Sequence, residues 1–328
     1  MGFHLGIVGT GRIADLQLAP AVRAASNTVL WSVMSRDRDR ATDFAKRHGA
    51  EAEHAAHDDL ADMLADPSLD GVLLATPDAL HAEQALQALQ AGKHVLTEKP
   101  MTTDPEDGRK LVKAAADTGL CVAVAYHLRW HAGHREARQR VLDGALGELR
   151  HARAQWTWQA PDGENWRASP EVGRWWSLAG VGTHCLDLLR WFLLPSEGEV
   201  ESQSSLLSTG VWDRPHDETA MVSLRFASGT TAQLLSSALF NSESVLEVHG
   251  SKGSLTCTGT LGPHGAGTVR LPDGVLEHEV KNPFVGEIED FASAATESRA
   301  PEVPATEGLR NVEILDEAAR AGGLSHYG

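Results

Sequence analysis

A glycine-rich turn near the start of the chain constrains its fold more than any other feature. The apolar run Phe3–Val8, typical of a buried parallel strand, is followed directly by the motif G-T-G-R-I-A at residues 9–14, which opens a predicted helix. In a strand–turn–helix unit, Gly9 permits the tight turn, Gly11 lets a pyrophosphate approach the main chain, and Ala14 keeps the helix close to the sheet. Free N–H groups and the helix dipole then bind the phosphates. We therefore expect a dinucleotide site, rather than a bare structural turn, that includes Gly9, Thr10, Gly11, Arg12 and Ile13.

The first 126 residues alternate strand-like and helical segments. The predicted strands are Phe3–Val8, Val29–Met34, Gly71–Ala75, His94–Glu98 and Leu120–Ala125. The predicted helices are Arg12–Ala25, Arg38–His48, His57–Ala65, His81–Ala91 and Pro105–Thr118, the last with Thr103 or Asp104 as N-cap. This alternation predicts an α/β Rossmann domain, a doubly wound parallel sheet with right-handed crossovers.

Beyond Tyr126 the pattern changes to long alternating strands. Helices are predicted at Gly133–Leu142, Thr183–Leu193, Val285–Glu297 and Thr306–Ala321. Strands are predicted at Arg150–Gln159, Val200–Leu207, Ala220–Ala227, Thr230–Phe240, Ser244–His249, Ser254–Gly259, Gly267–Leu271 and Val275–Val280. We expect an α+β domain with a large, mainly antiparallel sheet. The predicted domains are 1–126, which binds the dinucleotide, and 127–328, for substrate binding and oligomerisation, with the last helix a candidate to pack back on the first domain.

Composition excludes several classes of function. The 328 residues include 29 basic and 45 acidic side chains, a net charge of −16, which argues against nucleic acid as a partner. The longest apolar run, Leu186–Leu194, is interrupted by Asp187 and Arg190 and is too short to span a membrane. The N-terminus has no basic segment of a signal peptide, and the three cysteines form no CxxC pair. We expect a cytoplasmic protein with reduced thiols and no membrane partner.

The end of the second predicted strand bears on the choice of nucleotide. An acidic residue there usually binds the ribose of NAD, but this chain has Ser35-Arg36-Asp37, with Arg38 and Arg40 close behind. A hydroxyl followed by a guanidinium suits the 2′-phosphate of NADP. The alternatives are ordinary surface arginines at a helix start, and a ribose contact from Asp37. Ser35, Arg36 and Arg40 are therefore candidate cofactor residues, with NADP favoured over NAD.

Several further motifs together resemble one protein family. They are Thr76-Pro77-Asp78, Gly92-Lys93-His94-Val95-Leu96, Glu98-Lys99-Pro100, Arg129, residues 182–187 (G-T-H-C-L-D), residues 247–253 (E-V-H-G-S-K-G) and the helix around Phe284–Phe291. The pattern covers nearly the whole chain and is similar to the Gfo/Idh/MocA family of nicotinamide-dependent oxidoreductases. The resemblance implies further cofactor residues at Thr76, Pro77, His81, Glu98 and Lys99.

The resemblance also implies two catalytic residues, Lys99 and His184. The ammonium of Lys99 would stabilise an alkoxide on the substrate, and the imidazole of His184 would accept and return the hydroxyl proton. Without the resemblance, Lys99 reads as a surface lysine paired with Glu98, and His184 as a structural histidine at a helix start.

One position departs from the family pattern. Members that oxidise polyols and sugars commonly carry an aspartate four residues before the histidine, whereas this chain has Gly180. Asp187 lies three residues after His184 and shares a helix face with it, or instead caps the helix or pairs with Arg190.

Aromatic and basic residues before His184 suit a sugar or cyclic polyol. Five tryptophans lie shortly before the histidine motif, at positions 156, 158, 166, 175 and 176, with Arg129, Arg167 or Arg174 available for hydroxyl or acidic groups. Core packing is the alternative for most of them. The expected substrate-binding residues are Lys99, Arg129, Trp158, Trp176, His184 and Asp187. The spacing of His127, His131 and His134 is compatible with a metal, but no cysteine lies nearby, and we expect no metal.

The sequence therefore predicts a dehydrogenase or reductase that transfers hydride between NADP(H) or NAD(H) and a secondary alcohol or carbonyl of a sugar, cyclitol or related small molecule. Two alternatives on the same fold remain, a nucleotide-binding sensor without turnover and a hydrolase that retains its cofactor. By analogy with the family, we expect a homodimer or homotetramer formed through the sheet of the second domain.

Overall fold

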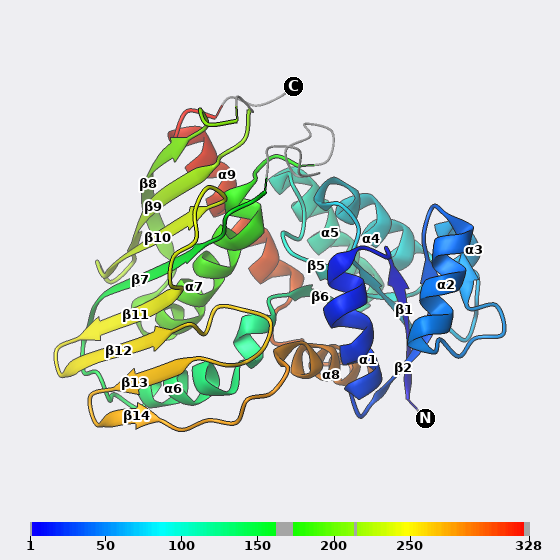
Figure 1. Cartoon of the computed structure of the whole chain (residues 1–328), viewed down its shortest axis with the longest axis horizontal. Helices are drawn as coiled ribbons and strands as arrows, with labels where there is room; N and C mark the ends of the chain where they lie inside the picture. Colours follow the sequence, from blue (N-terminus) through cyan, green and yellow to red (C-terminus); the bar gives the residue numbers. More distant parts are fainter. Residues whose placement is uncertain (1, 162–172, 213–214, 325–328) are drawn as a thin grey trace. The chain divides into compact units, whose positions relative to one another are not determined.

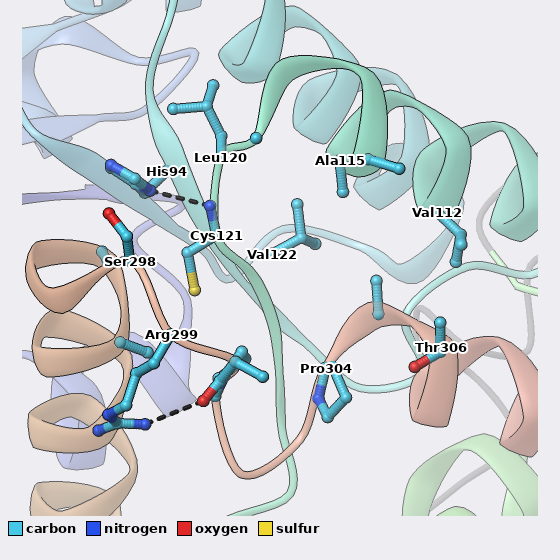
Figure 2. Close-up of a pocket in the computed structure, with 17 residues that line it drawn as sticks. His94, Val112, Ala115, Leu120, Cys121, Val122, Ser298, Arg299, Pro304 and Thr306 are labelled. Atoms are coloured by element: carbon cyan, nitrogen blue, oxygen red, sulfur yellow. Dashed lines mark hydrogen bonds between the residues drawn. The ribbon is translucent and has the colours of Figure 1, made fainter.

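The structure, a computed structural model, describes residues 2–161, 173–212 and 215–324 (Figure 1). The chain divides into two compact units, Met1–Tyr126 with Phe284–Val312 and His127–Pro283 with Glu313–Gly328. Residues 284–312, which the sequence analysis assigned to the second domain, thus belong to the first unit.

Apolar packing explains why this late segment joins the first unit. Helix α8 (Pro283–Glu297) contributes Phe284, Ile288 and Phe291 to the same buried cluster as Phe3 and Leu5 of the first strand. A helix with one wide apolar face must bury that face, and here it does so on the parallel sheet.

The first unit is built on a six-stranded, wholly parallel sheet in the order β3-β2-β1-β4-β5-β6, which confirms the predicted Rossmann fold. Its strands are β1 (Phe3–Val8), β2 (Thr28–Met34), β3 (Ala56–His57), β4 (Gly71–Leu74), β5 (His94–Glu98) and β6 (Val122–Ala125). Its helices are α1 (Ala19–Ala24), α2 (Arg38–His48), α3 (Leu60–Leu64), α4 (His81–Gln90), α5 (Pro105–Thr118), α8 and the start of α9 (Ala305–Ala321). The strand order reverses between β1 and β4, and ligands of such sheets bind at the carboxyl ends of the strands at this point.

Local signals explain most of these boundaries. Helix α2 is capped at its N-terminus by Asp37, whose carboxylate accepts hydrogen bonds from two main-chain amides, and at its C-terminus by Gly49 in the left-handed conformation. The expected helix Arg12–Ala25 contains a π-helical turn at Ala14–Leu18 before α1, next to Pro20, which has no N–H to donate.

The predicted helix His57–Ala65 is wrong at its start. His57 pairs with Met34 in the short strand β3, and α3 begins only at Leu60. The side chain of Asp59 accepts hydrogen bonds from the amides of Ala61 and Asp62. Because aspartate is a strong N-cap, Asp59 sets the first helical residue at Leu60, three residues after His57.

The second unit contains an eight-stranded sheet in the order β14-β13-β12-β11-β7-β10-β9-β8 (Figure 1). Its strands are β7 (Leu149–Thr157), β8 (Val200–Ser208), β9 (Thr219–Phe226), β10 (Thr231–Ser237), β11 (Val245–Gly250), β12 (Gly253–Thr258), β13 (Thr268–Leu271) and β14 (Gly274–Leu276). Every neighbouring pair is antiparallel except β10 and β7, which confirms the expected mainly antiparallel sheet.

Helices of the second unit cover one face of this sheet. Helix α6 (Ala132–Leu142) follows the 3₁₀ turn His127–Trp130, and α7 (Thr183–Glu197) follows a π-helical turn at Leu178–Gly182. Helix α7 packs against β7 and β10, and its residues are buried from Thr183 to Leu193. On β9 buried and exposed residues alternate, so the opposite face of the sheet is open.

Two further sequence expectations concern cysteines and membranes. Cys121, Cys185 and Cys257 are free thiols, as expected. In the described ranges, no helix combines the length and apolar character needed to cross a membrane.

Candidate functional site

The turn after β1 has the geometry that a dinucleotide requires. Gly9 has a φ of +103°, and a Cβ added to it would lie 2.6 Å from the carbonyl oxygen of Ala75. Its amide donates a hydrogen bond of 2.9 Å to Met34. Because the left-handed conformation and the close approach both exclude a side chain, only glycine fits here.

The next residues of the turn leave room for a ligand. No atom lies within 4 Å of the place where a Cβ on Gly11 would be. The hydroxyl of Thr10 is buried and has no hydrogen-bond partner among the described residues. Arg12 and Ile13 are exposed beside it. An open main-chain turn with an unused hydroxyl fits the phosphates of a dinucleotide.

The basic residues after β2 have different partners. Arg38 pairs with Asp58 at 2.9 Å, and Arg40 donates a long hydrogen bond of 3.4 Å to the carbonyl of Thr10. Arg36 is exposed and has no hydrogen bond or ion pair recorded within the described ranges. Among the basic residues there, Arg36 is thus the one whose guanidinium is available to a ligand.

The acidic residue at this position is already engaged. Oδ1 of Asp37 accepts hydrogen bonds from the amides of Asp39 and Arg40 at 3.0 and 3.1 Å. The hydroxyl of the buried Ser35 accepts a weak bond of 3.4 Å from the amide of Asp37. The helix cap therefore occupies the oxygen that a ribose contact from Asp37 would compete for.

The ends of β4 and β5 are joined through His81. The two nitrogens of this fully buried ring each lie 2.9 Å from a carbonyl oxygen, Nδ1 from that of Pro100 and Nε2 from that of Thr76. Thr76 Oγ1 also donates to Gln84 at 2.6 Å, and Pro77 leads into the turn Asp78–Leu80. Both ring nitrogens of His81 therefore face the main chain, so the ring connects the segments that follow β4 and β5.

Lys99 lies directly after β5, at the carboxyl edge of the parallel sheet. It is partly exposed, and it precedes a cis peptide bond to Pro100. Its amide donates a 3.1 Å hydrogen bond to the carboxylate of Glu98, which is buried. Glu98 therefore helps to fix the main chain that carries Lys99.

In the second unit, His184 lies in the first turn of α7 and is 3% exposed. Two rings pack against it. The ring of His127 lies 4.9 Å away in an edge-on arrangement, and the ring of Trp156 lies 5.4 Å away at a tilt. His127 entered the sequence analysis only as part of a candidate metal group, so this contact was missed.

The place of the usual aspartate is filled by an aromatic ring. A Cβ on Gly180 would lie 2.6 Å from Cη2 of Trp158. Trp158 thus lies in the second unit against the helix turn that precedes His184, as part of an aromatic cluster with Trp176 and Trp212.

Arg129 and Asp187 bind each other. Their two hydrogen bonds, at 2.9 and 2.6 Å, form a bidentate ion pair with side chains that are 4% and 1% exposed. Arg190, the other partner considered for Asp187, binds Glu199 at 3.1 and 2.6 Å. The buried pair joins the turn His127–Trp130 to α7 and so positions the elements that carry His127 and His184.

Trp176 is fully buried and packs against Trp212; its contact with substrate stays a prediction. Its ring lies 4.7 Å from that of Trp212, and its Nε1 is buried with no partner among the described residues. Arg174 pairs with Asp316 at 3.2 Å. Trp166 and Arg167 lie outside the described residues.

Asp217 is a residue of this region that the sequence analysis missed. Its carboxylate accepts hydrogen bonds from the amides of Trp176 and Leu178 and from the hydroxyl of Ser177, at 2.6 to 2.8 Å. Burial raises the pKa of Asp217 to about 6. The only sequence signal at this position is a run of polar residues, His216-Asp217-Glu218, before a strand. The turn that Asp217 caps lies 40 residues earlier in the chain, so this signal does not identify its partners.

The other candidate histidines form a packed cluster. The rings of His131 and His134 stack at 4.3 Å, and His134 hydrogen-bonds to the carbonyl of Leu128 and the hydroxyl of Thr260. Burial holds the pKa of His134 well below its usual value. Throughout the part of the chain that the structure describes, no three His, Cys, Asp or Glu side chains are arranged to hold a metal ion.

Family models match both parts of the chain. Residues 3–126 match the model described as the oxidoreductase family with an NAD-binding Rossmann fold, and residues 134–256 match the Gfo/Idh/MocA C-terminal domain.

Individual proteins give the same result. The chain is 32% identical to a 1,5-anhydro-D-fructose reductase of Ensifer adhaerens, over 84% of this chain and 81% of that protein. It is 27% identical to a scyllo-inositol 2-dehydrogenase (NADP⁺) of Bacillus subtilis, over 98% and 97%. The crystal structure of an aldose-aldose oxidoreductase from Caulobacter crescentus has a TM-score of 0.90 at 24% identity, over 98% of each chain, and shares the fold.

Proposed function

The chain belongs to the Gfo/Idh/MocA family of oxidoreductases, and on that basis we propose that it transfers hydride between a nicotinamide cofactor and a secondary alcohol or carbonyl of a sugar, cyclitol or related small molecule. The observation that carries this proposal is the open turn at Gly11, with the unused hydroxyl of Thr10, at the carboxyl end of β1. The reductase and dehydrogenase relatives act on an anhydro-sugar and a cyclitol by name, which supports the substrate class.

The cofactor, when bound, supplies or accepts the hydride. The amides of residues 9–13 would hold its pyrophosphate, and Thr76, Pro77 and Glu98 would line its nicotinamide half. We favour NADP(H) because Arg36 is exposed and available, whereas Arg38 is paired with Asp58.

The proton transfer falls to His184 and the charge stabilisation to Lys99. When an alcohol is oxidised, the proton of its O–H group would pass to His184, while the carbon that bears this oxygen would lose its hydride to the oxidised cofactor and become a carbonyl. In the reduction direction His184 returns the proton. The ammonium of Lys99 would stabilise the negative charge that develops on the oxygen.

A substrate panel tests this proposal. Purified protein is incubated with 1,5-anhydro-D-fructose and NADPH or NADH, and with scyllo-inositol and aldoses and NADP⁺ or NAD⁺, while absorbance of the reduced cofactor is recorded. We expect turnover of at least one substrate, reduced by roughly 10²–10⁴-fold in Lys99→Met and in His184→Ala. Absence of turnover with every pair would refute the proposal. A copurified dinucleotide without turnover would favour a sensor, because Gly180 replaces the usual aspartate.

We also propose that the protein is cytoplasmic and forms a homodimer or homotetramer through the open face of the second sheet. Leu206 and Met221 are 73% and 52% exposed on β8 and β9, where a partner would cover them. Light scattering should give a mass of two or four chains, which Met221→Glu lowers; a monomeric wild-type protein would contradict this.

A further inference from the structure

The indole of Trp158 and the main chain of Gly180 are fitted to each other. A Cβ on Gly180 would lie 2.6, 3.1 and 3.5 Å from three carbons at the benzene edge of Trp158. A carbon contact below 3.0 Å is repulsive, and the indole cannot bend away as a flexible chain would. The large side chain at 158 therefore requires the absence of one at 180.

This contact continues toward His184. Gly180 and His184 are four residues apart on successive helical turns, so they lie on the same face of the helix. Trp156 lies in β7 and Trp158 directly follows this strand, so these two side chains also point to the same side. Trp156 lies 5.4 Å from the ring of His184. Two indoles thus cover the positions where the family's aspartate and histidine lie side by side.

Packing holds the indole of Trp158 in place. It contacts the buried cluster of Ala160, Trp176 and Ala238, together with Trp212. Yet Trp158 remains partly exposed, whereas Trp176 is 0% exposed. Of these two tryptophans, Trp158 is the one that keeps surface for a ligand.

We propose that Trp158 is a specificity-determining residue that favours sugars in which one carbon carries no hydroxyl group, such as anhydro- and deoxy-sugars, over rings with a hydroxyl on every carbon. This inference rests on the proposed function and names its substrate class. A carboxylate at position 180 would bind a substrate hydroxyl, whereas an indole offers an apolar face that packs on C–H groups and leaves a hydroxyl without a partner. Pockets of this kind discriminate by roughly 10–100-fold.

A stability cycle tests the fit between the two residues without any substrate. Gly180→Ala should lower the Tm of the second unit by roughly 2–10 °C because the new Cβ meets the indole. When Trp158 is replaced by Ala, Gly180→Ala should lower the Tm by a much smaller amount. Gly182→Ala is the matched control, since its Cβ would meet Ser236 Oγ at 2.9 Å instead. Gly182→Ala should lower the Tm equally in the wild-type protein and in Trp158→Ala. If Gly180→Ala also lowers the Tm equally in both proteins, the indole of Trp158 is not what excludes a side chain at position 180.

Kinetics test the specificity. In Trp158→Gln, we expect kcat/KM for 1,5-anhydro-D-fructose to fall by roughly 10–100-fold while that for scyllo-inositol is unchanged or higher. Trp158→Phe, which keeps an aromatic face, should retain the wild-type ratio within about threefold. Trp31→Phe, in the first unit, is the tryptophan control and should not change the ratio.

The two possible failures are distinct. If Trp158→Gln lowers both kcat/KM values equally, the specificity assignment is overturned while the hydride-transfer function stands. If the wild-type protein turns over no substrate with either nicotinamide, the proposed function fails and the specificity assignment fails with it.

Discussion

In the first unit the candidate cofactor site is made largely of main chain, whereas in the second unit the surroundings of His184 are made of side chains. Gly9 and Gly11 shape an open turn, and Asp37 caps a helix within three residues of itself. Around His184, by contrast, Arg129 and Asp187 are 58 residues apart and Trp176 and Asp217 are 41 apart.

This difference implies that the two sites fail in different ways. Main-chain sites tolerate most side-chain changes but not a Cβ in the wrong place. Sites held by buried polar pairs lose stability when one partner is removed, because the other is left buried and unsatisfied. The predictions below test that contrast. Tryptophan fluorescence can follow the second unit, since eight of the nine tryptophans lie in residues 127–283.

The largest effect is expected from Asp187→Ala. It leaves the guanidinium of Arg129, 4% exposed, without its bidentate partner. Loss of one member of a buried pair costs about 3–5 kcal/mol in the free energy of unfolding. Urea unfolding followed by tryptophan fluorescence measures the change.

The matched control is an exposed pair in the first unit. Arg38 and Asp58 are 56% and 49% exposed, so Asp58→Ala should cost less than about 1 kcal/mol. Similar costs for Asp187→Ala and Asp58→Ala would show that the second site does not depend on its buried pair.

The next effect concerns Asp217 and pH. Burial raises the pKa of Asp217 to about 6, from 3.8 in an exposed carboxyl. Between these values the folded protein binds a proton that the unfolded chain has lost, so stability falls as the pH rises from about 4 to 6. The loss is roughly 3 kcal/mol and is complete above pH 6.

Asp217→Asn removes this titration. Its altered hydrogen bonds change the free energy of unfolding by an amount that does not depend on pH. On top of this constant, the stability of the variant relative to wild type should increase as the pH rises from 4 to 7. A pH-independent difference would mean that Asp217 does not bind a proton in this range.

The two units also differ in how much of their local structure the sequence could predict. The turn at Gly9 and the cap at Asp104 depend on neighbours within a few residues, so their patterns are visible in the chain. The partner of Asp187 depends on where the turn after β6 lies against α7. Helical spacing offered only neighbours on the same helix, His184 and Arg190, and did not point to Arg129.

Two other differences have the same cause. Gly180 was noticed as an absent carboxylate, but that Trp158 fills the space follows only from the packing of β7 on the turn before α7. His57, the second residue of the short strand β3, was assigned to the helix that follows it, because a strand of two residues is too short to show a period-2 pattern. Its strand geometry comes from pairing with β2.

A smaller effect is expected at the glycine turn. Gly9→Ala places a Cβ at a φ of +103° and close to Ala75, which should cost about 1–3 kcal/mol and abolish cofactor binding. Gly11→Ala enters open space, so stability should change by less than about 0.5 kcal/mol while cofactor affinity falls. Unfolding and cofactor titration separate the two effects. Normal cofactor affinity in Gly11→Ala would exclude a close approach of the pyrophosphate.

The smallest effect is expected from Arg36→Ala. An exposed guanidinium bound to a 2′-phosphate is partly screened by water, so we expect KM for NADP(H) to rise about tenfold, which is about 1.4 kcal/mol, with little change for NAD(H). Arg38→Ala is the control, because Arg38 is already paired with Asp58 and should change either KM less than about twofold. An equal loss with both cofactors would refute the 2′-phosphate assignment. Since Arg36 acts through its side chain alone, a selective loss would also identify a part of the first site that is not built from main chain.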